Sequence, residues 1–201
     1  RQIETRLSRR AMLAVPLAAA LPRPARAAPF ADALGRPIAL PGPARRIVLG
    51  FNFEEFTAVA GPAGWDRVVG MSKRLWSSWR AASFRRYAVP IPRLRDMPDV
   101  GDTDDGSFSL ERVLALKPDL VVLPEWSFSV LAQQVAQLQA AGIAVLVIDY
   151  NAEIPARHVA STLALAQATG QAGRARTLAD LYMSKLADIQ ARTAGATRKP
   201  S

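Results

Sequence analysis

Four short apolar runs constrain the fold of this chain more than any other feature of its sequence. They lie at Arg46–Gly50, Arg67–Met71, Asp119–Leu123 and Ile143–Ile148, and their central residues are apolar without alternation. A strand of this kind is buried on both faces, as in a parallel sheet that helices cover on each side. The chain is therefore predicted to be an α/β protein with three layers, a parallel sheet flanked by helices.

The segments between these runs carry helix signals. Proline near a first turn, glycine just past a last turn and apolar residues at helical spacing mark the expected helices. These are Glu54–Ala60, Ser109–Leu116, Phe128–Ala141, Pro155–Thr169 and Gln171–Thr193, the last with an apolar stripe of Leu178, Leu181, Tyr182, Leu186 and Ile189. Residues 32–43 predict an extended lead-in, and residues 73–98, which lack a clean period, predict a long loop with some helical turns.

Residues 1–27 are typical of an export signal that is removed from the mature protein. Six arginines and one glutamate give a net charge of +5, residues 11–21 are apolar, and Ala25 and Ala27 have the spacing of a cleavage site. Ser8-Arg9-Arg10 indicates the twin-arginine route, with an ordinary secretory signal as the alternative. No cysteine follows, which excludes a bacterial lipid anchor, so the mature protein is expected to be periplasmic.

The remaining composition excludes several classes of function. The net charge of the whole chain is +9, but residues 1–27 supply +5 of it, so the other residues carry only +4 and nucleic acid is not an expected partner. The chain has no cysteine, and His158 is its single histidine. Disulfide scaffolds, thiolate metal sites and histidine-rich zinc sites are therefore excluded, and His158 is expected to be a surface or half-buried helix residue.

Catalytic and cofactor motifs are absent or incomplete. Gly101 and Gly106 have the spacing of a phosphate-binding loop, but Ser107 and Phe108 replace the Lys and Ser/Thr that contact phosphate and magnesium. The aspartates between these glycines lack the spacing and the distal glutamate of a calcium loop. A nucleophile elbow is missing too, and with one histidine a Ser-His-Asp triad is not expected. The sequence favours binding over catalysis and predicts no cofactor and no metal ligand.

The segment between Arg67 and Arg95 is the strongest candidate for a ligand site. It holds eight basic residues, no acidic residue and four aromatic side chains, and it follows a strand, where open parallel sheets bind ligands. Indoles and guanidinium groups suit a bulky anionic or chelate-like ligand, although each could instead belong to the core or to a solvated face. With the aromatic loops after the first and third strands, the candidate ligand residues are Phe51, Asn52, Arg74, Trp76, Trp79, Arg80 and Trp126.

From residue 32 onward the chain resembles the substrate-binding proteins of iron–siderophore, haem and cobalamin ABC importers. The most specific match is the block Ser109–Val121 (SLERVLALKPDLV), and further matches are Asp32–Arg36, Ala44–Val48, Asp66–Gly70, Pro98–Gly101 and Gly142–Ile148. The resemblance implies two α/β lobes joined by one long helix, with the ligand held between them. Residues 28–170 would be the N-terminal ligand-binding lobe, and residues 171–201 the connecting helix, with the chain ending before the second lobe.

The same resemblance implies function and partners. The protein would bind a ferric siderophore or a related chelate, with haem or cobalamin as further candidates, and deliver it to an ABC permease in the inner membrane. Glu111 matches the glutamate by which the family docks on permease arginines; a glutamate there also complements the helix dipole. The basic cluster at Lys73–Arg86 favours an anionic ferric chelate. The alternative is a chelatase-like or other metal-dependent α/β enzyme domain, for which Glu54, Glu55 and Glu125 are the candidate carboxylates.

Overall fold

A four-stranded parallel sheet forms the centre of the computed structural model, which describes residues 29–195. Its strands are β3 (Ile47–Leu49), β4 (Val68–Met71), β5 (Leu120–Pro124) and β6 (Ala144–Ile148), in the order β4-β3-β5-β6. Every neighbouring pair in this sheet is parallel. The predicted α/β fold with a parallel sheet is therefore confirmed, whereas the predicted export signal at residues 1–27 lies outside the described residues.

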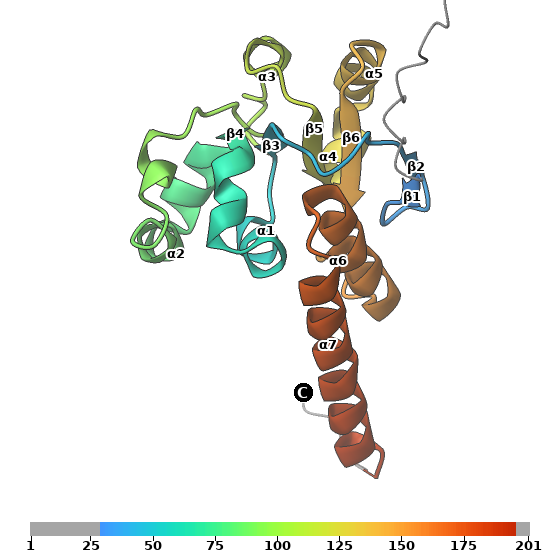
Figure 1. Ribbon diagram of the computed structural model, residues 1–201. Coiled ribbons are helices and arrows are strands. Elements are labelled where there is room, and N and C mark those ends of the chain that lie inside the picture. The colour runs from blue at the N-terminus through green and yellow to red at the C-terminus, as the bar shows by residue number, and fades with distance from the viewer. Residues whose placement is uncertain (1–28, 196–201) are drawn as a thin grey trace, which may run out of the picture.

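Two hydrophobic clusters lie on opposite faces of the sheet. Ile47 and Leu49 of β3 belong to one cluster, whereas Val48 between them belongs to the other. The first face packs against α1 (Phe53–Ala60) and α6 (Pro155–Thr169), and the second against α3 (Leu110–Ala115) and α5 (Ala132–Ala140). This alternation gives the three layers seen in Figure 1, because strands without polar residues must be covered on both sides.

The expected lead-in forms a short hairpin at the edge of the sheet. β1 (Phe30–Ala31) and β2 (Pro37–Ile38) pair antiparallel, and Ala33 N–H donates to the carbonyl of Val147 on edge strand β6 at 3.1 Å. Asp32, which is 3% exposed, accepts hydrogen bonds from the Arg36 guanidinium, which lies 4.0 Å from the ring centroid of Phe128. The hairpin thus satisfies backbone groups that an open edge would leave unpaired.

Two segments differ in detail from their predicted form. The helix expected at Phe128–Ala141 is two helices, α4 (Glu125–Val130) and α5, because Leu131 leaves the helical region at φ −92°, ψ 25° and buries its side chain. The predicted loop at residues 73–98 contains a π-helical turn (Leu75–Trp79), α2 (Ala81–Tyr87) and a 3₁₀ turn (Pro92–Asp96). Trp76 anchors this segment to the core, as described below.

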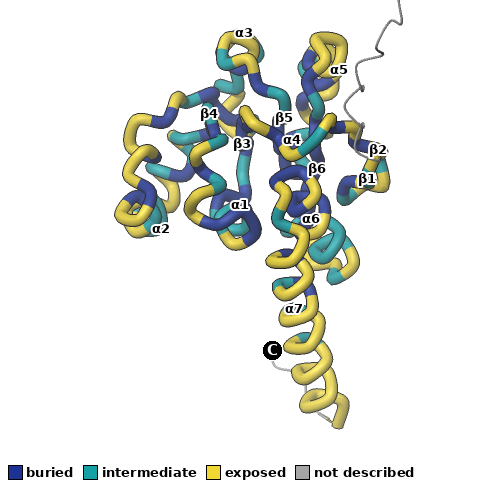
Figure 2. The backbone as a smooth tube through the Cα atoms, viewed as in Figure 1, coloured by how far each residue is buried: buried dark blue, intermediate teal, exposed yellow. Residues whose placement is uncertain are grey.

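The last helix, α7 (Ala172–Thr193), packs on α6 with its first turns and then extends away from the sheet (Figure 1). Figure 2 shows its far half as largely exposed. The predicted apolar stripe is accordingly divided: Leu178, Tyr182 and Leu186 are half-buried, whereas Leu181 and Ile189 are each 53% exposed. His158 is half-buried as predicted, and its ring stacks on Tyr182 at 4.0 Å, which joins α6 to α7.

Candidate functional site

The centre of the sheet contains a topological switch point. The chain passes from β3 to β4 on one side and then returns to the other side for β5 and β6, so the loops after β3 and β5 diverge. Ligands of open α/β sheets bind in the crevice that such diverging loops leave at the carboxyl ends of the strands. Phe51 follows β3 and Trp126 follows β5, and their rings meet edge to face with centroids 5.0 Å apart. Two of the predicted ligand residues therefore lie together at this switch point.

Glycine at position 50 lets the two loops approach each other. A Cβ there would lie 2.9 Å from Cδ2 of Leu123 and 3.3 Å from the carbonyl oxygen of Val122, both on β5. Gly50 N–H donates to that carbonyl at 2.8 Å, which extends the ladder beyond the last residue of β3. The close approach brings Phe51 beside Trp126, and a larger residue at position 50 would require the Leu123 side chain and the Val122 carbonyl to shift.

Asn52 combines backbone strain with an unsatisfied polar atom. It precedes α1 in the left-handed conformation (φ 56°, ψ 46°) and is 3% exposed. Its Nδ2 donates to Oδ1 of Asn151 in the loop after β6 at 3.4 Å, but its own Oδ1 is buried without a partner. Buried amide oxygens are normally hydrogen-bonded, and exceptions of this kind are frequent at functional sites.

The structure corrects the assignment of Trp76 as a ligand residue. This indole is 1% exposed and lies between Phe53 and Trp65, with ring centroids 4.8 Å and 5.9 Å away and nearly parallel planes. Its Nε1 donates to Oε1 of Glu54 at 3.3 Å. Trp76 is therefore a core residue that anchors the segment after β4. Trp79, three residues further on, is 71% exposed and remains available to a ligand.

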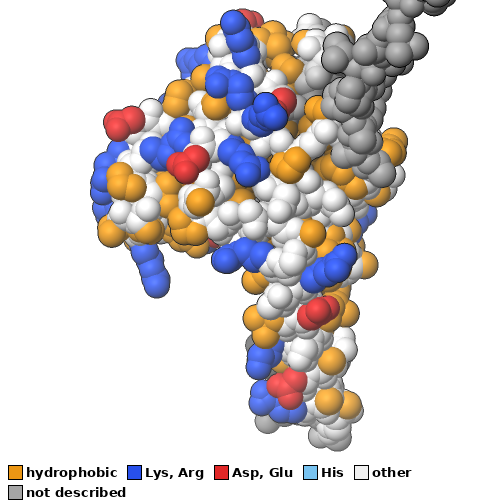
Figure 3. Space-filling model, in the orientation of Figure 1, with side chains coloured by type: hydrophobic (Ala, Val, Ile, Leu, Met, Phe, Trp, Pro, Cys, Tyr) orange, Lys and Arg blue, Asp and Glu red, His pale blue; other side chains and the backbone are white. Residues whose placement is uncertain are grey.

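Neither predicted arginine has an unpaired guanidinium group. Arg74 forms an ion pair with Asp105, and Arg80 forms one with Glu54 at 3.2 Å. Hydrogen bonds from Ser107, with a further contribution from Arg74, lower the pKa of Asp105, so this carboxylate stays charged. Figure 3 shows basic side chains over α2 and α3 with acidic ones among them. The expectation of a strongly cationic cluster that selects an anion is not supported by these pairings.

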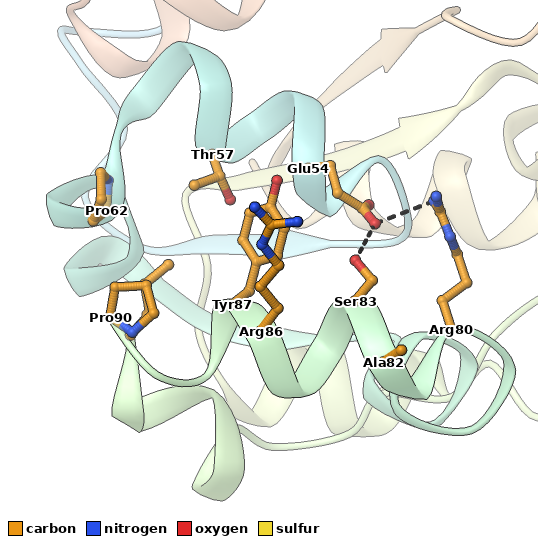
Figure 4. Close-up of a pocket in the computed structure, with 10 residues that line it drawn as sticks. Glu54, Thr57, Pro62, Arg80, Ala82, Ser83, Arg86, Tyr87 and Pro90 are labelled. Carbon is orange, nitrogen blue, oxygen red and sulfur yellow. Dashed lines mark hydrogen bonds and ion pairs between the residues drawn. The ribbon is translucent and has the colours of Figure 1, made fainter.

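Two cavities adjoin these ion pairs. The smaller, with a volume of about 270 Å³, is lined by Arg74, Trp79 and the aspartates of the turn after Gly101. The larger is a groove of about 630 Å³ between α1 and α2 (Figure 4). Its residues are Glu54, Thr57, Pro62, Arg80, Ala82, Ser83, Arg86, Tyr87, Pro90 and Ile91. Most of these were not predicted, because the groove arises only when α2 packs beside α1.

The carboxylates of the enzyme alternative do not converge on one point. Glu54 accepts hydrogen bonds from Trp76 and Ser83 and forms an ion pair with Arg80, whereas Glu125 accepts a hydrogen bond from Ser129 at 3.3 Å within its own helix. Burial, with a smaller contribution from the charge of Glu54, raises the pKa of Glu55. Within residues 29–195, no group of three His, Cys, Asp or Glu side chains is arranged to hold a metal ion. Glu54 and Glu125 therefore serve in separate local contacts, and the side chains that meet at the switch point enclose a space of only about 10 Å³.

Comparison with known proteins identifies the family. The profile described as "Periplasmic binding protein" matches residues 57–201. The chain belongs to the periplasmic binding protein family. No curated protein matches the chain closely enough in sequence to count as a relative.

Solved structures of this family share the fold. The TroA-like periplasmic binding protein FepB from Veillonella parvula is 28% identical with a TM-score of 0.79, over 86% of this chain and 51% of that one. The molybdate-binding protein MolA from Haemophilus influenzae is 17% identical with a TM-score of 0.66, over 84% and 54%. BauB, solved with two acinetobactin molecules and ferric iron, is 16% identical with a TM-score of 0.58, over 85% and 56%. The chain thus spans about half the length of the structures that it matches.

Glu111 lies apart from the other site residues of this periplasmic binding protein. It is exposed in the first turn of α3, where its Oε2 accepts a hydrogen bond from Ser109 Oγ at 3.0 Å. Its own backbone N–H and Ser109 lower its pKa, so the side chain is an anion at neutral pH. In Figure 1, α3 lies on the side of the sheet away from α7. None of the helices in residues 29–195 has the length and apolar character needed to cross a membrane.

Proposed function

We propose that this chain is the extracytoplasmic binding component of an ABC importer and that it binds a metal chelate, such as a ferric siderophore, haem or cobalamin. The observation that carries the proposal is the aromatic edge that Phe51 and Trp126 form at the switch point, together with exposed Trp79, which lines an adjoining cavity of about 270 Å³. Exposed aromatic rings beside a few polar groups are the usual lining of a site for a large organic ligand. The names of three solved relatives support the same ligand class: BauB with ferric acinetobactin, the haem-binding protein HmuT and the vitamin B12-binding protein BtuF.

Tryptophan fluorescence tests this proposal directly. The full chain is titrated with ferric hydroxamate, catecholate and carboxylate siderophores, haemin and cyanocobalamin, with molybdate as a ligand without an organic chelator. We expect one chelate to quench the emission saturably, and Trp79→Ala to weaken its binding by about 5- to 150-fold, since stacking on an aromatic side chain is worth about 1–3 kcal/mol.

Val89→Ala is the matched control. Val89 is 73% exposed just after α2 and lines none of the cavities described above, so its truncation is expected to leave binding unchanged. Equal losses in the two variants would mean that Trp79 acts through the fold. If no chelate binds, or if only molybdate binds, the proposed function is wrong.

Delivery to a permease is the second half of the proposal, and Glu111 is its proposed contact. An exposed anion at a helix start can pair with arginines of a partner without changing the ligand crevice. Glu111→Ala is expected to leave chelate affinity intact in the isolated protein and to lower uptake in cells, whereas Glu111→Asp retains part of the uptake. A loss of affinity in the isolated protein would contradict the docking role.

A further inference from the structure

The groove between α1 and α2 extends well beyond the crevice at the switch point. Glu54 and Arg80 lie at one end of it, and Pro62 and Pro90 lie at the other end, as Figure 4 shows. The first of these ends starts directly after β3, so the groove opens from the same carboxyl edge of the sheet that holds Phe51 and Asn52. Arg80 of the groove directly follows Trp79, which lines the cavity of about 270 Å³, so a ligand bound beside Trp79 could reach the near end of the groove.

The polar atoms at the near end already have partners within the protein. Oε1 of Glu54 accepts a hydrogen bond from Ser83 Oγ at 2.7 Å and forms an ion pair with Arg80 at 3.2 Å. The hydroxyl of Thr57 donates to the carbonyl of Phe53 at 2.7 Å and accepts from Nε1 of Trp65 at 2.9 Å. Because these groups are satisfied, a polar ligand would gain little from them, whereas an apolar one would leave none of them unpaired. Arg86, the remaining charged residue of the lining, is exposed to solvent.

The far end of the groove is apolar and rigid. Pro62, Pro90 and Ile91 form its far end, and proline rings leave little conformational freedom to lose on binding. The ring of Tyr87 packs against the buried indole of Trp76 at 5.3 Å, so this wall is fixed to the core. The volume of about 630 Å³ is in the range of preformed ligand pockets, roughly 300–1,000 Å³.

We infer that this groove is a subsite for an apolar arm, aliphatic or aromatic, of a chelate whose polar part lies at the carboxyl edge of the sheet. The inference rests on the proposed function for the identity of the chelate. The ligand would then be amphiphilic, with a polar chelate at the carboxyl edge of the sheet and an apolar arm in the groove.

A series of ligands that differ only in the length of an apolar arm tests whether the groove binds that arm. Ferric desferrioxamine B acylated on its free amine with acetyl, butyryl, hexanoyl or octanoyl groups keeps the chelate constant and lengthens the arm. Calorimetry with the full chain is expected to show affinity rising by about fourfold for each added methylene until the groove is filled.

Ala82→Phe fills the groove from an exposed position on α2, and Arg85→Phe places the same ring on that helix outside the groove. We expect the length dependence to vanish in Ala82→Phe and to persist in Arg85→Phe, with equal melting temperatures confirming that both variants fold. An equal length dependence in both variants would overturn the inference.

A second probe separates this inference from the proposed function. The dye 8-anilinonaphthalene-1-sulfonate reports apolar sites without any metal chelate. If Ala82→Phe reduces dye binding and Arg85→Phe does not, the groove is supported as a subsite. This holds even if no ferric chelate binds, because that failure would refute only the proposed function. Unchanged dye binding in Ala82→Phe would overturn the subsite. Sedimentation that shows a dimer in the parent chain and a monomer in Ala82→Phe would also overturn it, since the groove would then join two copies.

Discussion

Replacing Trp76 by alanine tests whether this residue is core or ligand contact. The indole is 1% exposed and stacks between Phe53 and Trp65, so its removal leaves a cavity at the centre of an aromatic layer. Truncation of a buried tryptophan costs about 3–5 kcal/mol of unfolding free energy. The lost hydrogen bond to Glu54 adds little, because that carboxylate keeps its hydrogen bond from Ser83 and its ion pair with Arg80.

For a domain of this size, 1 kcal/mol corresponds to about 2–4 °C in melting temperature. Trp76→Ala is therefore expected to lower the melting temperature by roughly 6–20 °C, measured by circular dichroism at a fixed protein concentration. Trp79→Ala, three residues along the same segment and 71% exposed, should change it by less than about 2 °C. Equal effects of the two substitutions, or a stable Trp76→Ala variant that loses chelate binding, would refute the reasoning.

Three further predictions concern the first turn of α1. Glu54→Gln removes the charge that neutralises Arg80, so calorimetry should show tighter binding of an anionic ferric chelate; weaker binding would mean that Arg80 does not face the ligand. Because burial raises the pKa of Glu55, its protonated form stabilises the folded state below the ordinary value of 4.5, and this stabilisation is lost as the pH rises through the raised pKa. Thermal melts of Glu55→Gln should consequently fall less with rising pH than those of the parent chain, and parallel curves would contradict the burial. Asn52→Gly removes a left-handed non-glycine residue and an unpaired buried oxygen, so urea unfolding should show a gain of about 1 kcal/mol, with no gain if that oxygen is satisfied in solution.

The layers of the fold were predictable because each depends on local pattern. Strands such as Val121–Leu123 are apolar on both faces, and only a covered sheet tolerates that. Pro155 and Gly170 bound α6 at the predicted residues, since a proline at the first turn and a left-handed glycine after the last one are sufficient signals. The break at Leu131 was not predictable, because nothing in its neighbours interrupts helical spacing; a buried contact with the sheet decides it.

The site was predictable only in part, for a physical reason. Aromatic residues after strands are visible in the sequence, and the meeting of Phe51 with Trp126 follows from the parallel sheet. The spacing of Trp76 and Trp79, by contrast, does not say which indole is buried. The two rings point differently because a π-helical turn, rather than an α-helix or a loop, carries them. Composition alone predicted that both indoles contact the ligand, whereas in the structure Trp76 stacks on Phe53 in the core.

The same limit applies to charge, which was a weaker guide to the candidate site than the positions of the aromatic residues. Between residues 67 and 95 the sequence holds eight basic residues and no acid, which suggests a cationic surface. Yet Arg74 pairs with Asp105, 31 residues away, and Arg80 pairs with Glu54, 26 residues before it. Local charge density is therefore a poor guide to the field at a crevice that distant loops build together. We therefore expect a ligand at this edge to meet aromatic rings beside arginines that are already paired, and to be selected by shape and apolar contact as well as by charge.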